Sequence, residues 1–241
     1  MRESAVLVAH QPAYLPWPGY FSRLLDVDEL LLLDHVQFTE RGWQNRNRVR
    51  SVGGRGPVWL TVPVRRSFGQ SINEVRLADP AWARRHWLTL THTYARAPYW
   101  PAYRDQLASL YQRPWERLVP LNVALTRFLL DALGLRVRLV RSSSVEPVGT
   151  RTDMLVSLCE RTGRRVLRVG AGAMTYLDVE LLRAHDIGLE VASYTHVPYG
   201  SAARQGWAAG LSVLDLVLHE GPAALDVLRA GARTERKALV P

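Results

Sequence analysis

Two short apolar runs, residues 6–9 and 30–33, are the feature that most constrains how this chain folds. Each run is bounded by polar or turn-forming residues and has the length of a buried strand. Residues 19–25 lie between them and have the apolar spacing of a helix. A strand, a helix and a strand within about 30 residues form a βαβ unit, whose two strands run parallel. The chain is therefore predicted to fold around a largely parallel sheet.

Polar residues follow both predicted strands directly. His10, Gln11 and Pro12 follow the first strand, and Pro12 ends it because proline has no N–H to donate to a sheet. Asp34 and His35 follow the second strand. The carboxyl ends of parallel strands share one edge of a sheet, where ligands of open α/β sheets bind. We therefore expect His10 and Asp34 to meet at this edge. The alternative for a lone histidine such as His10 is a structural role in a turn.

The pattern continues along the rest of the chain. Residues 49–64 are predicted to form a β-hairpin around a glycine-rich turn, and residues 80–134 a helical region that prolines divide. Further strands are predicted at residues 136–140, 166–169 and 189–194. His196 follows the last of these strands, so we expect it at the same edge as His10.

The expected architecture is α/β, with a mixed, largely parallel central sheet flanked by helices. A chain of 241 residues is long enough to bury a large core in one domain. We therefore predict a single α/β domain over residues 1–231. Residues 232–241 are charged and are expected to form a flexible tail.

The charge balance favours an anionic partner. The net charge is +9, from 31 Lys and Arg residues against 22 Asp and Glu. Such an excess is typical of proteins that bind a nucleotide, a phosphorylated substrate or RNA. However, every basic residue except Lys237 is an arginine, which is also expected of a GC-rich genome. The arginines are spread along the chain, so the sequence alone does not place a basic surface.

Cysteine content and hydropathy limit the cellular setting. Cys159 is the one cysteine, which excludes a disulfide within the chain and a metal site built from several thiolates. No apolar run approaches the roughly 20 residues of a membrane-spanning helix. Residues 1–12 lack the cleavage site of a signal peptide. We therefore expect a cytoplasmic protein with no membrane partner.

An amide-rich segment follows the second strand. Gln44, Asn45, Arg46 and Asn47 offer amide donors, amide acceptors and a guanidinium group in four successive positions, beside Trp43. We interpret this segment as a site of substrate recognition, in preference to a solvated loop.

Several segments occur together that resemble one known family. Near the start these are residues 10–17 (HQPAYLPW), 34–38 (DHVQF), 43–47 (WQNRN) and 59–64 (WLTVPV). Further along they are Ser142-Ser143, Gly170 before Tyr176-Leu177, His196 with Pro198-Tyr199, and residues 211–216 (LSVLDL). Over about residues 5–221 the chain thus resembles the WbqC-like family.

The chain departs from the family pattern at three places. Ala13 stands where asparagine is usual, and residues 167–169 (LRV) replace an aromatic residue followed by Leu-Ser. Val197 separates His196 from Pro198, which are usually adjacent. The last two departures bear on the identity of the substrate more than on the fold.

The resemblance implies a glycine or other aminoacyl transferase that acts in the synthesis of surface polysaccharides, modified sugars or specialised metabolites. The acyl donor would be a carrier-protein or coenzyme A thioester, or an aminoacyl-tRNA. The acceptor would be an amino sugar or a metabolite. We expect no permanently bound cofactor and no metal, and the chain has no Walker-type phosphate loop.

Acyl transfer needs a base for the acceptor and a donor for the developing oxyanion. The predicted catalytic residues are His10 as the base, Asp34 as its orienting partner, and His196 in the same cleft. Asn45, Arg46 or Asn47 would polarise the acyl carbonyl. The full set of predicted substrate-binding residues is Gln11, Tyr14, Trp17, His35, Gln37, Trp43, Gln44, Asn45, Arg46, Asn47, His86, Ser142, Ser143, Gly170 and Tyr199.

Two alternatives belong to other functional classes. One is a non-catalytic binding module for a nucleotide-sugar or RNA, in which the histidines only form hydrogen bonds. The other is a metal-dependent enzyme with His10, Asp34, His35 and His196 as ligands. The chain contains no His-Glu-x-x-His motif in support of the second alternative.

Overall fold

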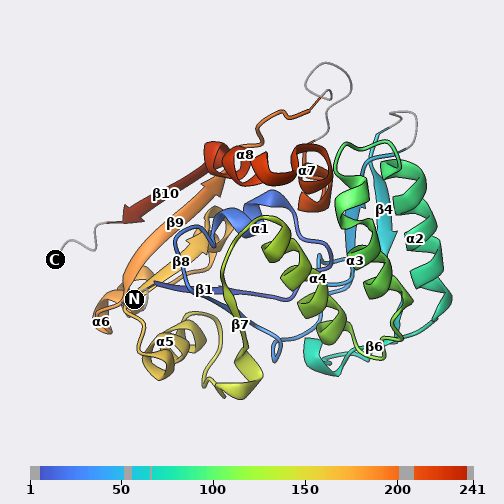
Figure 1. The fold of residues 1–241 in the computed structure, drawn as a ribbon. Coiled ribbons are helices and arrows are strands. Elements are labelled where there is room, and N and C mark those ends of the chain that lie inside the picture. The colour runs from blue at the N-terminus through green and yellow to red at the C-terminus, as the bar shows by residue number, and fades with distance from the viewer. Residues whose placement is uncertain (1–5, 52–55, 66, 201–208, 238–241) are drawn as a thin grey trace.

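The computed structural model describes residues 6–51, 56–65, 67–200 and 209–237. Within these ranges the central sheet has six strands in the order β10-β9-β8-β1-β2-β7 (Figure 1). The strands are β1 (Val6–His10), β2 (Glu29–Leu32), β7 (Arg138–Arg141), β8 (Val166–Gly170), β9 (Gly188–Tyr194) and β10 (Ala232–Lys237). The first five run parallel, and β10 runs antiparallel to β9. The predicted mixed, largely parallel sheet is confirmed.

The strand order reverses at β1. From β1 the chain passes to β2 and β7 on one side, then returns to build β8 and β9 on the other side. Val8 pairs with Leu30 of β2 and with Arg168 of β8, so β1 is hydrogen-bonded along both edges. In open α/β sheets, ligands bind beyond the carboxyl ends of the strands at such a reversal. His10 is the last residue of β1 and lies at this position.

Side chains of the central strands alternate between two apolar layers. Val8, Leu30 and Leu32 face one layer, and Leu7 and Leu31 face the other. The first layer is covered by α1 (Pro18–Ser22), α4 (Leu118–Ala132), α7 (Val213–Glu220) and α8 (Ala224–Gly231). The second is covered by α5 (Arg151–Thr162) and α6 (Val179–Ala184) (Figure 1). Cover on both faces explains why every residue of β2 is buried.

A long excursion separates β2 from β7. It contains the hairpin of β3 (Arg46–Val49) and β4 (Val58–Thr61), and the short pair β5 (Val64–Arg65) and β6 (Arg76–Leu77). The helices α2 (Ala81–Tyr94) and α3 (Trp100–Gln112) then precede α4. The predicted hairpin and helical region are confirmed. Residues 52–55, which include much of the predicted hairpin turn, lie outside the described residues.

Residues 232–237 differ from the expected flexible tail, because they form β10. Six successive residues of β10 pair with β9, from Ala232 with Tyr194 to Lys237 with Leu189. Most of its side chains are exposed, so the strand depends on backbone pairing and has no apolar pattern. Charged side chains are common on edge strands, where they discourage pairing with other chains. The charged residues that led us to expect a flexible tail therefore belong to an edge strand. Residues 238–241 lie outside the described residues.

A buried carboxylate joins the excursion to the helices. Asp215 of α7 is fully buried and accepts two hydrogen bonds from Arg50, at 2.9 and 3.0 Å. The hydroxyls of Tyr94 and Tyr199 donate to the same carboxylate at 2.9 and 2.8 Å. Three other segments of the chain thus bind the one charge that α7 carries.

We predict that Asp215→Asn destabilises the protein strongly, because it leaves the partly buried Arg50 guanidinium without a counter-charge. Breaking a buried ion pair typically costs about 3–5 kcal/mol, and the partial exposure of Arg50 places this case near the lower end. The matched control is Asp105→Asn, which removes an exposed ion pair with Arg104 and should change stability by less than about 1 kcal/mol. Urea unfolding at pH 7 measures both, and equal losses would contradict the prediction.

Candidate functional site

His10 lies where three cavities meet. The sheet crevice, of about 410 Å³, is lined by residues at the ends of β1 and β8 together with Arg23 and Arg151. The aromatic pocket, of about 400 Å³, is lined by Trp17, Tyr20, Trp43 and His196, among others. The side pocket, of about 240 Å³, is lined by Gln11, Trp43 and Gln44, among others. His10 lines all three, and Arg23 lines the first two.

The imidazole of His10 has a defined tautomer. Its Nδ1 lies 3.0 Å from the backbone oxygen of Gln11, and a carbonyl oxygen can only accept, so Nδ1 carries the proton. Nε2 is then left with a lone pair. Burial lowers the pKa of His10 to about 4, and the positive charge of Arg23 acts in the same direction. His10 is therefore neutral at pH 7, and the ring of Tyr20 packs edge-on against it at 4.7 Å.

Asp34 does not orient His10, so this expectation is wrong. The Asp34 carboxylate is fully buried and accepts hydrogen bonds from Arg141, Ser142 and Ser143, at 2.6 to 3.1 Å. Although burial acts to raise it, these hydrogen bonds hold the pKa of Asp34 below its usual value. No hydrogen bond joins Asp34 to His10 in the described part of the chain.

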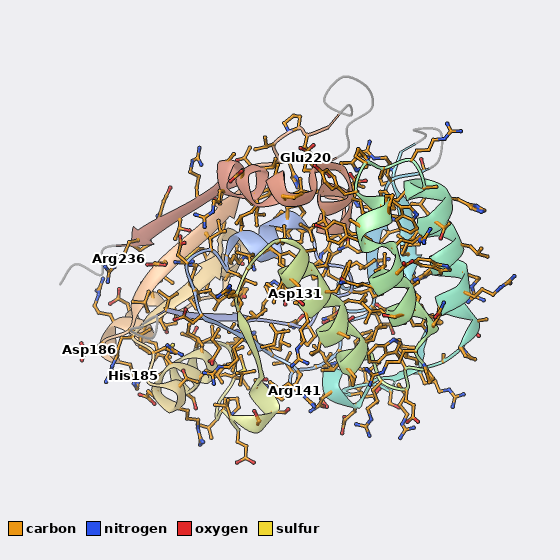
Figure 2. All side chains as sticks on the ribbon, viewed as in Figure 1. Asp131, Arg141, His185, Asp186, Glu220 and Arg236 are labelled. Atoms are coloured by element: carbon orange, nitrogen blue, oxygen red, sulfur yellow. The ribbon has the colours of Figure 1, made fainter. Side chains whose placement is uncertain are left out.

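The register between β1 and β2 explains why Asp34 does not reach His10. Leu32 is the residue of β2 that pairs with His10, and Asp34 comes two residues later, where the chain has turned towards the end of β7. Figure 2 labels Arg141 at the end of β7, on the side of β2 away from β1. The Asp34 carboxylate ties the ends of these two strands together.

His35, Ser142 and Ser143 belong to the same structural cluster. Nδ1 of His35 lies 2.5 Å from Oγ of Ser142, and its Nε2 lies 3.2 Å from the sulfur of Met154. Met154 lines the sheet crevice, so His35 sits behind the wall of the crevice. Ser142 is fully buried. These three predicted substrate-binding residues therefore lie outside the cavities around His10 and have a structural role.

The amides of the segment after β2 bind the protein itself. Nδ2 of Asn45 donates to the carbonyl of Val62 at 2.9 Å, and Nδ2 of Asn47 donates to that of Leu15 at 2.6 Å. Gln44 donates to the side-chain oxygen of Gln11 at 2.7 Å. Asn47, Gln44 and Gln11 still line cavities beside His10, whereas Asn45 lines none of the three.

Trp43 and Arg46 lie at the outer end of the site. The Trp43 side chain is 47% exposed and lines both the aromatic and the side pocket. Its ring packs against Trp59 at 5.6 Å, and the guanidinium of Arg46 stacks over Trp59 at 4.4 Å. Arg46 also donates to the backbone oxygen of Arg41 and lines none of the three cavities.

Four other predicted substrate-binding residues lie away from His10 and its cavities. The hydroxyl of Tyr14 is fully buried and lies 2.8 Å from Nδ1 of His86 and 2.6 Å from the hydroxyl of Tyr111. Burial lowers the pKa of His86 to about 4, as for a structural core histidine. Tyr199 binds the buried Asp215, and Gln37 lines a separate surface hollow.

The structure brings His196 and His10 to one cavity, as expected. The His196 ring lies 5.6 Å from that of Trp17, and its Nε2 accepts a hydrogen bond from the backbone of Gly210 at 3.2 Å. Burial lowers the pKa of His196, and the charge of Arg48 adds to this effect. Trp17 lines the aromatic pocket and Gly170 the sheet crevice, so both remain site residues.

Comparison with known protein families finds a match that spans most of the chain. The model of the WbqC-like protein family matches residues 11–227, from beside His10 to within α8.

The chain belongs to the WbqC-like protein family.

The chain is also 31% identical over 224 residues to "Uncharacterized protein Rv1507c" of Mycobacterium tuberculosis, a match that covers 91% of this chain and 95% of that protein. No solved structure matches it with comparable significance.

Within the described residues, no three His, Cys, Asp or Glu side chains are grouped as metal ligands would be. His10, Asp34, His35 and His196, the ligands of the alternative metal-dependent enzyme, do not form such a group. Among the described helices, none combines the length and the apolar composition that a membrane crossing requires.

Arg23 and Tyr20 are site residues of this WbqC-like protein that the sequence analysis missed. The hydroxyl of Tyr20, which is 2% exposed, has no hydrogen-bond partner among the described residues, and Tyr20 lines the aromatic pocket. Arg23 has no carboxylate within 4.0 Å in the described part of the chain. The signal in the sequence was their spacing of three residues in the segment after β1, which places both on one helical side.

Arg168, one of the departures from the family pattern, holds Arg23 in place. It is buried in β8 and pairs with Glu190 at 2.8 Å. Its Nη1 also donates to the backbone carbonyls of Arg23 and Leu25, at 3.0 and 2.7 Å. A residue that replaces the family's usual one thus fixes the backbone that carries Arg23.

We predict that the pKa of His10, measured by NMR titration of its ring nitrogens, is about 4. Arg23→Gln should raise this pKa only part of the way to 6.5, because burial is the larger cause of its depression. The control Arg84→Gln removes an exposed arginine on α2 and should leave the pKa unchanged. His10→Gln identifies the signal, and a wild-type pKa near 6.5 would contradict the assigned environment.

Proposed function

We propose that this protein is an acyltransferase that moves a glycyl or other aminoacyl group from an activated donor onto an amine or hydroxyl. The acceptor is an amino sugar or a specialised metabolite. The observation that carries the proposal is the neutral His10, whose Nε2 lone pair lies at the junction of three cavities. Two substrates can approach one base there from different cavities. Membership of the WbqC-like family supports the proposal.

The proposed reaction uses Nε2 of His10 as a general base. As the acceptor nitrogen or oxygen attacks the donor carbonyl, its proton passes to Nε2. A C–N or C–O bond forms to the acceptor, and the thioester or ester bond of the donor breaks. The proton on His10 then passes to the departing thiolate or alkoxide. The carbonyl of Gln11 takes the orienting role that Asp34 was expected to fill, because it holds Nδ1–H throughout.

Arg23 and Tyr20 are the proposed donors to the developing oxyanion. Both line the aromatic pocket with His10. Burial raises the pKa of the Tyr20 hydroxyl well above its usual value, so it stays protonated and can donate. They replace Asn45, Arg46 and Asn47 in this role, since the amides of the two asparagines bind backbone carbonyls and Arg46 stacks on Trp59.

The low pKa of His10 has a consequence for this mechanism. At neutral pH the base is unprotonated and ready, but a group of pKa about 4 is a weak base. An anionic substrate beside Arg23 would offset the charge that depresses the pKa. Substrate binding would then raise the pKa of His10 and make it a stronger base during the reaction.

The donors proposed are a coenzyme A or carrier-protein thioester, or an aminoacyl-tRNA, with no permanently bound cofactor. An activated ester or thioester supplies the driving force for transfer, so ATP need not bind here. The net charge of +9 favours any of these anionic donors.

We predict that His10→Gln lowers the rate of transfer by about 10²–10⁴-fold while the melting temperature changes little. Glutamine keeps a hydrogen-bonding side chain but cannot take up the proton. Glycyl and alanyl thioesters of coenzyme A are incubated with amino sugars, and the amide product is measured by mass spectrometry. His185→Gln, at an exposed histidine paired with Glu160, is the control and should keep full activity. A His10→Gln protein with the wild-type rate would refute His10 as the base.

A second candidate function is a non-catalytic module that binds a nucleotide-sugar. It is favoured by the lining of the cavities around His10, which holds arginines and neutral side chains but no Asp or Glu among the described residues. In that case uridine diphosphate glucose would bind equally well to the His10→Gln protein, and no acyl donor would be consumed by the wild type.

A further inference from the structure

The sheet crevice contains two arginines with no acidic partner. Arg23 is partly buried, and Arg151 is exposed. Within the described residues, neither has a carboxylate within 4.0 Å, and no Asp or Glu lines the crevice. A guanidinium that is partly removed from water without a counter-charge is costly, and burial lowers the pKa of Arg23. A bound anion would supply the missing charge.

The backbone leaves room for Arg23 at the end of β8. A Cβ atom on Gly170 would lie 2.5 Å from Nη2 of Arg23, so glycine lets the guanidinium approach the strand end. A hydrogen bond from Arg168 to the carbonyl of Arg23 also fixes the backbone that carries this side chain. The backbone of Arg23 is thus fixed, and the end of β8 leaves space for its guanidinium.

Arg151 is held on the α5 side of the same crevice. It is the first residue of α5, and its φ of 51° is left-handed, a strained conformation for a residue other than glycine. The Arg151 side chain lines the crevice from the start of a 12-residue helix, where the Thr150 side chain makes no capping hydrogen bond. The helix dipole adds to the attraction for an anion, and Asp153, the acidic residue of the first turn, does not line the crevice.

The size and lining of the crevice indicate the class of anion. A carboxylate would need one guanidinium, whereas two arginines match the two negative charges of a diphosphate diester. A volume of about 410 Å³ is in the range of small-molecule sites. Tyr176, with its side chain 57% exposed, also lines the crevice and offers a ring face to a nucleobase.

We propose that the sheet crevice binds the diphosphate group of a nucleotide, held between Arg23 and Arg151 with the base against Tyr176. The diphosphate group would belong to a substrate of the acyl transfer proposed above. Only its role as a substrate rests on that proposed function, because the binding itself does not require the transfer. Two kinds of molecule carry a diphosphate diester. One is a nucleoside-diphosphate sugar, which would be the acceptor, and the other is coenzyme A, which would be part of the donor. The aromatic pocket on the other side of His10 is left for the second substrate.

Calorimetric titration with inorganic pyrophosphate, UDP and coenzyme A tests the inference. All titrations are made at one ionic strength near 0.15 M, because salt screens such contacts. Wild-type protein should bind UDP or coenzyme A more tightly than pyrophosphate, and the tighter nucleotide identifies the source of the diphosphate. Arg23→Gln and Arg151→Gln should each weaken this binding about tenfold or more.

Three controls distinguish binding at this site from the effect of net charge and from loss of the fold. Arg84→Gln removes the same charge from α2 and should leave the affinity unchanged. Arg151 is exposed, so Arg151→Gln keeps the test valid if loss of Arg23 harms the fold. Tyr176→Ala should weaken the nucleotides while it leaves pyrophosphate unaffected. Equal losses in Arg84→Gln and Arg151→Gln, or no binding of any of the three probes, would overturn the inference.

The test of the diphosphate site can fail or succeed independently of the test of the proposed acyl transfer. Arginine-dependent nucleotide binding that persists in His10→Gln, with no acyl transfer by the wild type, would reject the transferase and keep the diphosphate site. Transfer at the wild-type rate and KM in Arg151→Gln, whose arginine has no part in the proposed transfer step, would reject the diphosphate site and keep the transferase.

Discussion

The pairing of β1 with both β2 and β8 is the constraint on which the rest of the structure depends. β1 is covered by layers on both faces and is paired with β8 as far as Val8 and with β2 as far as His10, which fixes the place where the strand ends. The chain that leaves β1 crosses to one face through α1, whereas the chain that leaves β8 passes through the 3-10 helix Ala171–Thr175 to α6 on the other face. The two connections diverge, and the space between them is the sheet crevice. His10 lies at its base because the strand ends there.

The sequence predicts the parts of this arrangement that depend on local pattern. The apolar runs identified β1 and β2, proline and glycine marked the hairpin and the helical region, and Pro12 placed His10 at a strand end. The partner of Asp34 could not be predicted in the same way. Arg141 and Asp34 are separated by 107 positions in the chain, and only the placement of β7 beside β2 brings them together. Ser142 and Ser143 are predicted from the sequence to bind substrate, but both bind the buried carboxylate of Asp34.

The amide-rich segment shows a second limit of sequence analysis. Irregular segments leave backbone carbonyls, such as those of Leu15 and Val62, that must find donors when they are buried. Asn45 and Asn47 supply these donors, yet in sequence they cannot be distinguished from amides that recognise a substrate. Arg23 and Arg151 illustrate the reverse case. In a chain with 31 Lys and Arg residues they look like ordinary surface arginines, and only the folded crevice sets them apart.

The long excursion between β2 and β7 bears on the order in which the protein folds. β1 and β2 are joined by a short helical crossover, so their pairing closes a small loop. β7 reaches β2 only after the hairpin and three helices have been traversed. Loop-closure entropy and the slow formation of distant contacts both oppose the early pairing of β2 with β7. In Figure 2, His185 and Asp186 mark the amino end of the sheet, just before β9. At the opposite end of the sheet, Asp34 binds Ser142 and Ser143, and this contact forms only after β7 pairs with β2. A ribosome must therefore release about three-fifths of the chain before this part of the sheet can close.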